Sequence, residues 1–137
     1  MSMSIRGMKR VTPRVVQDNS AAVRILKTET GRTKDGLKRL VCQVKTRPSN
    51  PAEVKQRYHL IVQATKPGKK LSEDSVRVYC ECKFFTYYGC ADVLYKRGAC
   101  WQKYATGIMP DIRNPRYIPF VCKHLFRVFE LIERKKM

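Results

Sequence analysis

Four residues with metal-binding side chains form two closely spaced pairs in this sequence. Cys80 and Cys82 are separated by one residue, and Cys122 and His124 have the same spacing much later in the chain. Thiolate and imidazole are soft ligands that suit zinc, and four of them close a tetrahedral coordination sphere. The sequence therefore predicts a structural zinc ion bound by Cys80, Cys82, Cys122 and His124.

The local sequence lets both pairs point at one ion. The stretch 75–80 alternates valine with polar residues as a strand does, so Cys80 and Cys82 can present their sulfurs on the same side. On a regular helix Cys122 and His124 would lie about 200° apart. We therefore expect Cys122 to precede a helix and His124 to lie in its first turn.

A strand-borne C-x-C followed by a C-x-H at a helix start resembles the SWIM-type zinc finger. This resemblance implies a zinc-stapled β-β-α module, here at 75–137. The connection between the two pairs is longer than in many SWIM modules, which implies an insertion at 83–118.

A second resemblance concerns the short motifs in and after the insertion. These motifs are Gly98–Cys100, Tyr104–Gly107, Pro110–Pro115 and Pro119–Leu125. They are similar to motifs in small structural proteins of tailed bacteriophages. The resemblance implies a place in the virion, in the capsid, neck, tail or baseplate. It also implies other virion proteins as partners, in a symmetric assembly of many copies.

The six cysteines leave alternatives to zinc open, namely a disulfide framework or buried thiols. The stretch 1–8 has no apolar signal core, so we expect no secretion by a signal peptide and a reducing intracellular compartment before assembly. We expect Cys42, Cys90 and Cys100 to serve in packing.

The chain is short and strongly basic. Its 137 residues fit one domain, and 29 Lys and Arg against 11 Asp and Glu give a net charge of +18. Such a charge attracts polyanions, so the partner could be nucleic acid or acidic protein surfaces. No apolar run is long enough to span a membrane.

Residues 1–19 lack an apolar period and are predicted to form a basic arm that orders against a partner. We expect its deletion, at least over 1–14, to leave the fold intact. Its candidate partner-binding residues are Arg6, Lys9, Arg10 and Arg14.

Residues 20–137 are predicted to form a single α+β domain. β-branched and alternating stretches with turn residues between them predict an antiparallel meander of four strands at 23–30, 37–46, 54–65 and 75–80. The apolar spacing of Leu125, Val128, Phe129 and Ile132 predicts a C-terminal helix packed on one face of the sheet.

The insertion holds most of the aromatic residues, interleaved with Lys and Arg. Three roles stay open for them: local core, protein interface, or a platform for single-stranded nucleic acid. The candidate partner-binding residues here are Trp101, Tyr104 and Tyr117.

No catalytic grouping can be assembled from this sequence, and a zinc ion with four protein ligands keeps no open position for water. We expect a non-enzymatic structural component of a large assembly, most simply a phage virion, without a small-molecule substrate. The alternative is a SWIM-type module that binds DNA or a protein partner.

Overall fold

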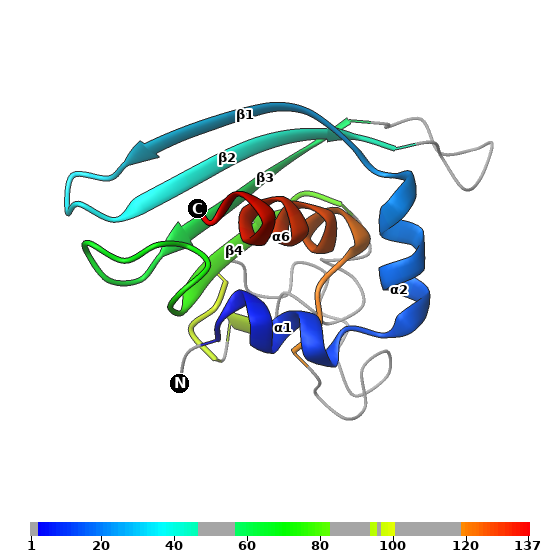
Figure 1. The fold of residues 1–137 in the computed structure, drawn as a ribbon, viewed down its shortest axis with the longest axis horizontal. Coiled ribbons are helices and arrows are strands. Elements are labelled where there is room, and N and C mark those ends of the chain that lie inside the picture. Colours follow the sequence, from blue (N-terminus) through cyan, green and yellow to red (C-terminus); the bar gives the residue numbers. More distant parts are fainter. Residues whose placement is uncertain (1–2, 47–56, 83–93, 96, 101–118) are drawn as a thin grey trace.

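A computed structural model describes residues 3–46, 57–82, 94–95, 97–100 and 119–137. Four antiparallel strands form one sheet in the order β1-β2-β3-β4, and they are β1 (Arg24–Arg32), β2 (Lys38–Lys45), β3 (Arg57–Ala64) and β4 (Val76–Cys80). The helices lie together on one face of this sheet (Figure 1). The predicted α+β class and the four-stranded meander are confirmed.

The turn between β1 and β2 forms as its sequence predicts. The Thr33 N–H donates to the Leu37 carbonyl over 2.9 Å, and Gly36 has a φ of 79°. Glycine adopts this left-handed conformation without steric cost, so Asp35-Gly36 closes the hairpin.

The inner face of the sheet is apolar because alternate side chains on a strand point to the same side. On β2 and β3 every second residue is buried, which gives Leu40, Cys42 and Val44 opposite Tyr58, Leu60 and Val62. Val76, Val78 and Cys80 continue this face on β4. The predicted core face is therefore confirmed.

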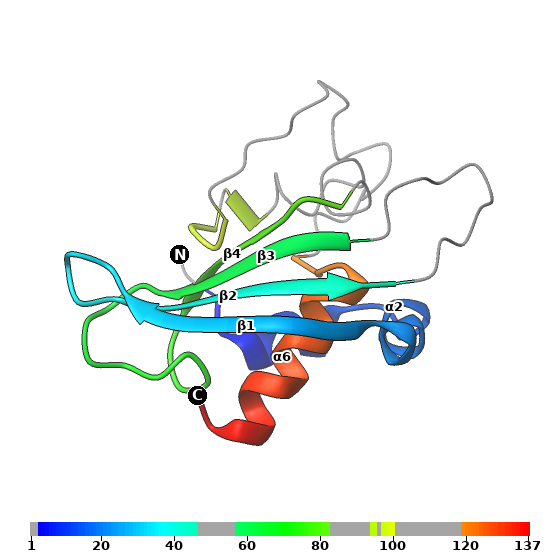
Figure 2. The same ribbon diagram turned by 90° about the horizontal axis from the view of Figure 1, so that it is seen from above.

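The C-terminal helix α6 (Lys123–Lys135) covers that face, and the view from above shows it crossing under the strands (Figure 2). Its predicted apolar stripe is buried, with Leu125, Val128, Phe129 and Ile132 each at 0% exposure. The helix ends at Lys135, and the C-cap residue Lys136 has a left-handed φ of 54°. Sheet and helix form the two layers of the domain.

The N-terminal segment differs from the predicted arm because it forms regular structure. It consists of α1 (Ile5–Val11), α2 (Arg14–Asn19) and the 3-10 turn η1 (Ser20–Ala22). Ile5 and Met8 are almost completely buried in the core. Their spacing is a helical i, i+3 pair too short to be recognised as a period, and packing against α6 stabilises it.

The expected dispensability of residues 1–14 is therefore wrong. Deletion would remove Ile5 and Met8 from the core and expose their neighbours. It would also remove the Met3 carbonyl, which accepts a hydrogen bond from the Val76 N–H of β4 over 2.9 Å. Loss of buried side chains of this size costs about 2–5 kcal/mol each.

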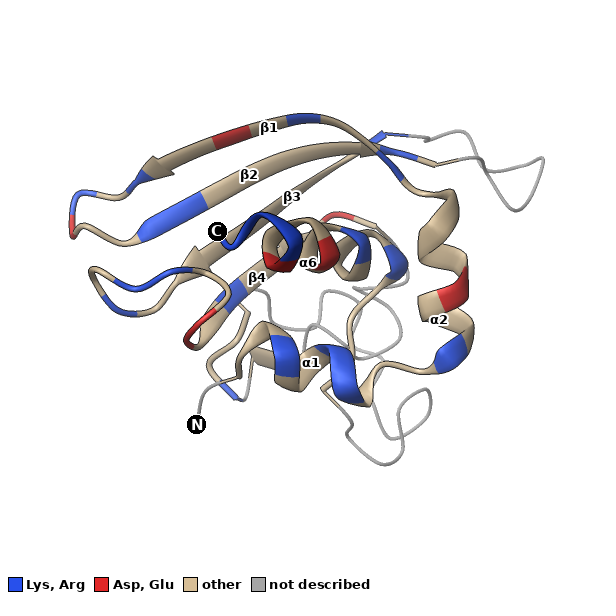
Figure 3. Cartoon of the chain, in the orientation of Figure 1, with Lys and Arg blue, Asp and Glu red and all other residues tan. Residues whose placement is uncertain are grey.

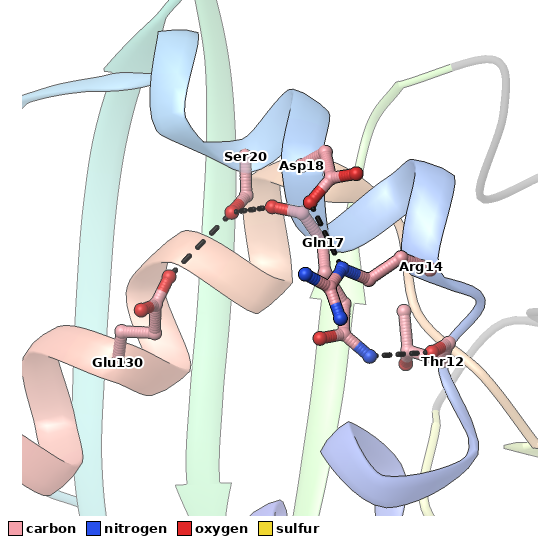
Figure 4. A network of polar contacts seen from close by, with 6 residues as sticks. All are labelled: Thr12, Arg14, Gln17, Asp18, Ser20 and Glu130. Atoms are coloured by element: carbon pink, nitrogen blue, oxygen red, sulfur yellow. Dashed lines mark hydrogen bonds and ion pairs between the residues drawn. The ribbon is translucent and has the colours of Figure 1, made fainter.

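Polar contacts hold α2 and η1 in place beside α6 (Figure 4). The Gln17 side chain donates to the Thr12 carbonyl over 2.8 Å, and the Ser20 hydroxyl donates to the Gln17 carbonyl over 2.6 Å. Ser20 also lies 3.5 Å from the Glu130 carboxylate of α6. These bonds cap the turn and connect it to the second layer.

A described part of the insertion packs on the free side of β4. Leu94, Ala99 and Cys100 are buried, and the Val78 N–H donates to the Ala99 carbonyl over 2.8 Å. This contact agrees with a local core role for part of the insertion. Most of its aromatic residues lie outside the described residues.

In the part that the structure describes, no helix has the length and apolarity needed to cross a membrane.

Candidate metal centre

The structure brings the four predicted ligands together. One ligand atom each from Cys80, Cys82, Cys122 and His124 can be chosen so that all of them lie within 4.8 Å of one another, and all four residues are buried. In a tetrahedral site with zinc–sulfur bonds near 2.3 Å, ligand atoms are separated by about 3.8 Å. The cluster is therefore of a size that could hold a metal ion.

The elements position these side chains as the sequence predicts. Cys80 is the last residue of β4, where it pairs with Leu60, and Cys82 follows just beyond the strand end. Cys122 precedes α6 as its N-cap with extended backbone angles, φ −77° and ψ 168°. His124 then lies in the first turn. The change from extended to helical backbone at Cys122 lets both side chains point the same way.

The buried imidazole of His124 is the strongest local indication of a ligand. The residue is 3% exposed, and neither ring nitrogen has a hydrogen-bond partner among the described residues. A buried polar nitrogen without a partner costs about 1–3 kcal/mol. Coordination of a metal would remove this cost for one of the two nitrogens, because the lone pair of that nitrogen would then be used.

The surroundings of the cluster are apolar and aromatic. The Tyr58 ring lies against His124 with 4.6 Å between ring centroids. Burial is the largest cause that raises the pKa of Cys80 and the pKa of Cys122 well above the ordinary value. Hydrogen bonding with the Cys122 and Cys80 thiols instead lowers the pKa of Cys82 well below the ordinary value. Cys80 and Cys122 stay neutral without a compensating positive charge, and a bound cation would supply that charge.

A hydrogen bond from the N-terminal segment fixes the chain just before the second ligand pair. The buried Thr12 hydroxyl accepts from the Val121 N–H over 3.3 Å and donates to the Met8 carbonyl over 2.7 Å. Val121 precedes Cys122 directly. Thr12 was not identified from the sequence, because a single threonine one helical turn after Met8 does not indicate a contact with a distant part of the chain.

Glu81 points away from the cluster, as strand alternation predicts. Its carboxylate accepts from the His59 N–H over 2.7 Å and lies 3.2 Å from His59 Nδ1. The other histidine of the chain thus belongs to a surface contact on β3, with 61% of its side chain exposed.

The remaining described cysteines do not join the cluster. Cys42 is buried in the sheet face on β2, and Cys100 is buried next to the edge of β4. No disulfide joins the described cysteines to each other. Burial raises the pKa of Cys42 from 9.0 to about 11, so this thiol is neutral at ordinary pH. Cys90 lies outside the described residues.

The predicted partner-binding residues fall into two groups. Arg6, Lys9, Arg10 and Arg14 line one open depression of about 1090 Å³ between the N-terminal helices and α6. Within it Lys9 forms an ion pair of 2.6 Å with Glu133 and lies over the Phe126 ring. The second group lies outside the described residues and comprises Trp101, Tyr104 and Tyr117.

Fold and site together define an α+β protein with a buried Cys3His cluster that could bind a metal ion. Comparisons of the chain with protein-family models, with curated proteins and with solved structures found no match.

Proposed function

We propose that the chain is a non-enzymatic structural component of a large assembly, stapled by one zinc ion, and that the assembly is a tailed-phage virion. The observation that carries the zinc part is the burial of three sulfurs and an orphaned imidazole within 4.8 Å of one another. Zinc fits this donor set better than the harder cations, which prefer oxygen ligands.

The staple would join the two layers of the domain. Cys80 and Cys82 come from the end of β4, whereas Cys122 and His124 come from the start of α6. An ion held by both pairs would fix the entry of the helix relative to the sheet. In small proteins such sites contribute directly to the free energy of folding.

The virion part of the proposal is supported by the resemblance of Gly98–Cys100 and the three later motifs to small phage structural proteins. Four protein ligands would leave zinc without a position for substrate, which favours a structural role over a catalytic one. The depression lined by Arg6 and Arg10 supplies a basic contact surface for neighbouring proteins.

The metal is tested by native mass spectrometry of the freshly isolated chain. We expect one zinc ion per chain, lost in Cys82→Ser but retained in the control Cys42→Ala, whose side chain lies in the sheet core. Removal of the ion by a chelator should lower the melting temperature of the parent chain. A metal-free parent chain, or full zinc content in Cys82→Ser, would contradict the proposed site.

The place in the assembly is tested by electron microscopy of particles that carry an epitope tag after Met137. We expect the tag at symmetry-related positions on the particle, because a structural component occupies every equivalent site. Particles that assemble fully and lack the chain would overturn the virion proposal while leaving the zinc proposal standing.

A second candidate function is DNA binding by a zinc module. It is favoured by the net charge of +18 and by Lys and Arg on both α1 and α6, drawn blue in Figure 3. The salt dependence of DNA binding distinguishes it from the first candidate, as argued in the Discussion.

A further inference from the structure

A second groove, of about 600 Å³, lies between β1 and α6. It contacts eight consecutive residues, 21–28, of which the last five, 24–28, lie at the start of β1. Successive side chains of a strand point to opposite faces, so a groove that touches all five must follow the edge of the strand. The groove therefore gives access to the backbone of β1.

That edge is open in the part of the chain that the structure describes. β1 is the outermost strand, pairs only with β2 and is exposed over nearly all of its 9 residues. The opposite edge of the sheet is covered differently, because the Val76 and Val78 N–H groups of β4 donate to the carbonyls of Met3 and Ala99. An uncovered edge strand is a template for an added strand.

The pairing of β1 with β2 is irregular beside the groove. The register shifts between Ile25 and Lys27, and Leu26 between them is 41% exposed. Across the groove lies Leu131 of α6. Leu131 is only 6% exposed, so Leu26 supplies most of the apolar surface that an extended segment could contact.

The groove carries a one-sided charge. Among the described residues its lining includes five cationic side chains and no carboxylate, and the cations are Arg24, Lys27, Arg127, Arg134 and Lys135. Lys27 has one acidic partner, Glu29, at 3.1 Å, and the Arg127 guanidinium donates to the Val23 carbonyl over 3.4 Å. Figure 3 shows Lys and Arg in blue on both β1 and α6. An occupant must be acidic to complement them.

We propose that this groove binds an extended acidic segment of a partner protein, which adds a fifth strand along the free edge of β1. Its main chain would pair with β1, and its carboxylates would lie against the cations of α6. Nucleic acid fits less well, because phosphates cannot donate to the strand carbonyls and none of the described residues that line the groove is aromatic and able to stack on a base. A second copy is disfavoured by repulsion between chains of charge +18.

This inference goes beyond the proposed function, since the described lining of the groove includes neither the metal ligands nor the candidate partner-binding residues of the N-terminal segment, which are Arg6, Lys9, Arg10 and Arg14. It requires neither zinc nor a virion. If the groove binds no acidic segment, the zinc content found by native mass spectrometry and the labelling of particles would therefore be unaffected.

The charge part is tested with a capped ten-residue peptide of alternating Glu and Val, titrated into the full chain at physiological salt. The double variant Arg24→Glu/Arg134→Glu should weaken binding by about tenfold or more, because like charges then face each other. The matched control Lys34→Glu/Lys69→Glu changes the net charge equally at exposed sites outside the groove, and screening should limit its effect to about twofold.

The backbone part is tested by the same peptide with proline in place of each valine. Proline lacks the N–H that pairs with a strand edge, so binding should be lost. Amide exchange of residues 24–28 should slow when the valine peptide binds. Equal binding of the proline peptide, or equal weakening by the two double variants, would overturn the proposal. The proposal would also be overturned if a single-stranded oligonucleotide of the same charge bound more tightly than the valine peptide and lost affinity in Arg24→Glu/Arg134→Glu but not in the control variant.

Discussion

His124 and Cys42 are both buried, but their surroundings give them different chemical roles. His124 has two buried ring nitrogens without hydrogen-bond partners in the described part of the chain, and three cysteine sulfurs lie beside it. Cys42 is equally buried, at 1% exposure, but faces the apolar sheet core. The surroundings of His124 suit a metal ligand, whereas the apolar surroundings of Cys42 stabilise its neutral thiol form.

The raised pKa of Cys42 predicts a loss of stability at alkaline pH. The unfolded thiol ionises near pH 9.0, whereas the folded thiol ionises near 11. Between these values the unfolded chain binds fewer protons, so the free energy of unfolding falls as pH rises through this range, by up to about 2 kcal/mol. The measurement is urea denaturation of the full chain at pH 8 and pH 10.

Cys42→Ala isolates this effect because other groups titrate in the same range. The variant should be less stable than the parent at pH 8, since it leaves a cavity, but its stability should fall less between the two pH values. Equal falls in the two proteins would show that Cys42 does not carry the dependence.

At the scale of elements, the metal cluster depends on how the chain enters α6. Cys122 caps the helix from extended backbone, and its carbonyl accepts from the Phe126 N–H over 3.0 Å. The preceding Val121 is tied to Thr12, so the end of α1 helps to position the second ligand pair. The N-terminal helices are thus part of the support of the site.

Thr12→Val tests this support. Valine has nearly the same shape but no hydroxyl, so the buried Val121 N–H would lose its acceptor, at a cost of about 1–3 kcal/mol. We expect this decrease in the free energy of unfolding of the metal-bound chain. Thr12→Ser is the matched control, because it keeps the hydroxyl. If the valine variant were as stable as the parent, the hydrogen bond would not support the site.

At the scale of the whole molecule, the positive charge is spread over several surfaces. Arg6 and Arg10 line the depression between the N-terminal helices and α6, and Arg24 and Arg134 line the groove beside β1. Lys69 lines a third, smaller pocket. Carboxylates moderate the first, where Glu133 pairs with Lys9. This spread is typical of general attraction to anions more than of one recognition surface.

We therefore expect DNA binding to be weak and governed by salt. Each neutralised phosphate contributes about −0.9 to the slope of log affinity against log salt, and nonspecific dissociation constants lie at about 10⁻⁴–10⁻⁶ M at physiological salt. Fluorescence anisotropy with duplexes of unrelated sequence should show a steep slope and equal affinities.

The variant Arg6→Gln/Arg10→Gln should reduce the slope by at most about two, since an arginine that neutralises one phosphate contributes about 0.9 to it. This substitution replaces deletion of the segment, which would remove core residues. Tight binding to one duplex sequence at physiological salt would contradict the structural role and favour the DNA-binding alternative.

The sequence by itself determined the strands, the helix and the arrangement within each ligand pair, because these depend on local periodicity. Alternation along 54–65 predicted the strand that contains β3 and its buried side, and the i, i+3, i+4, i+7 spacing predicted the buried side of α6. The two-residue spacing of each ligand pair required a strand end and a helix start, and both are present. The kind of metal stays a prediction.

Only the tertiary structure decided the role of the N-terminal segment and of the open strand edge. Ile5 and Met8 become core residues because α6 and the sheet leave an apolar surface that a short helix can cover, and seven residues carry too little periodicity to reveal this. Thr12 acquires its function through Val121, far along the chain. The exposure of β1 likewise follows from strand order, which no local pattern in Arg24–Arg32 encodes.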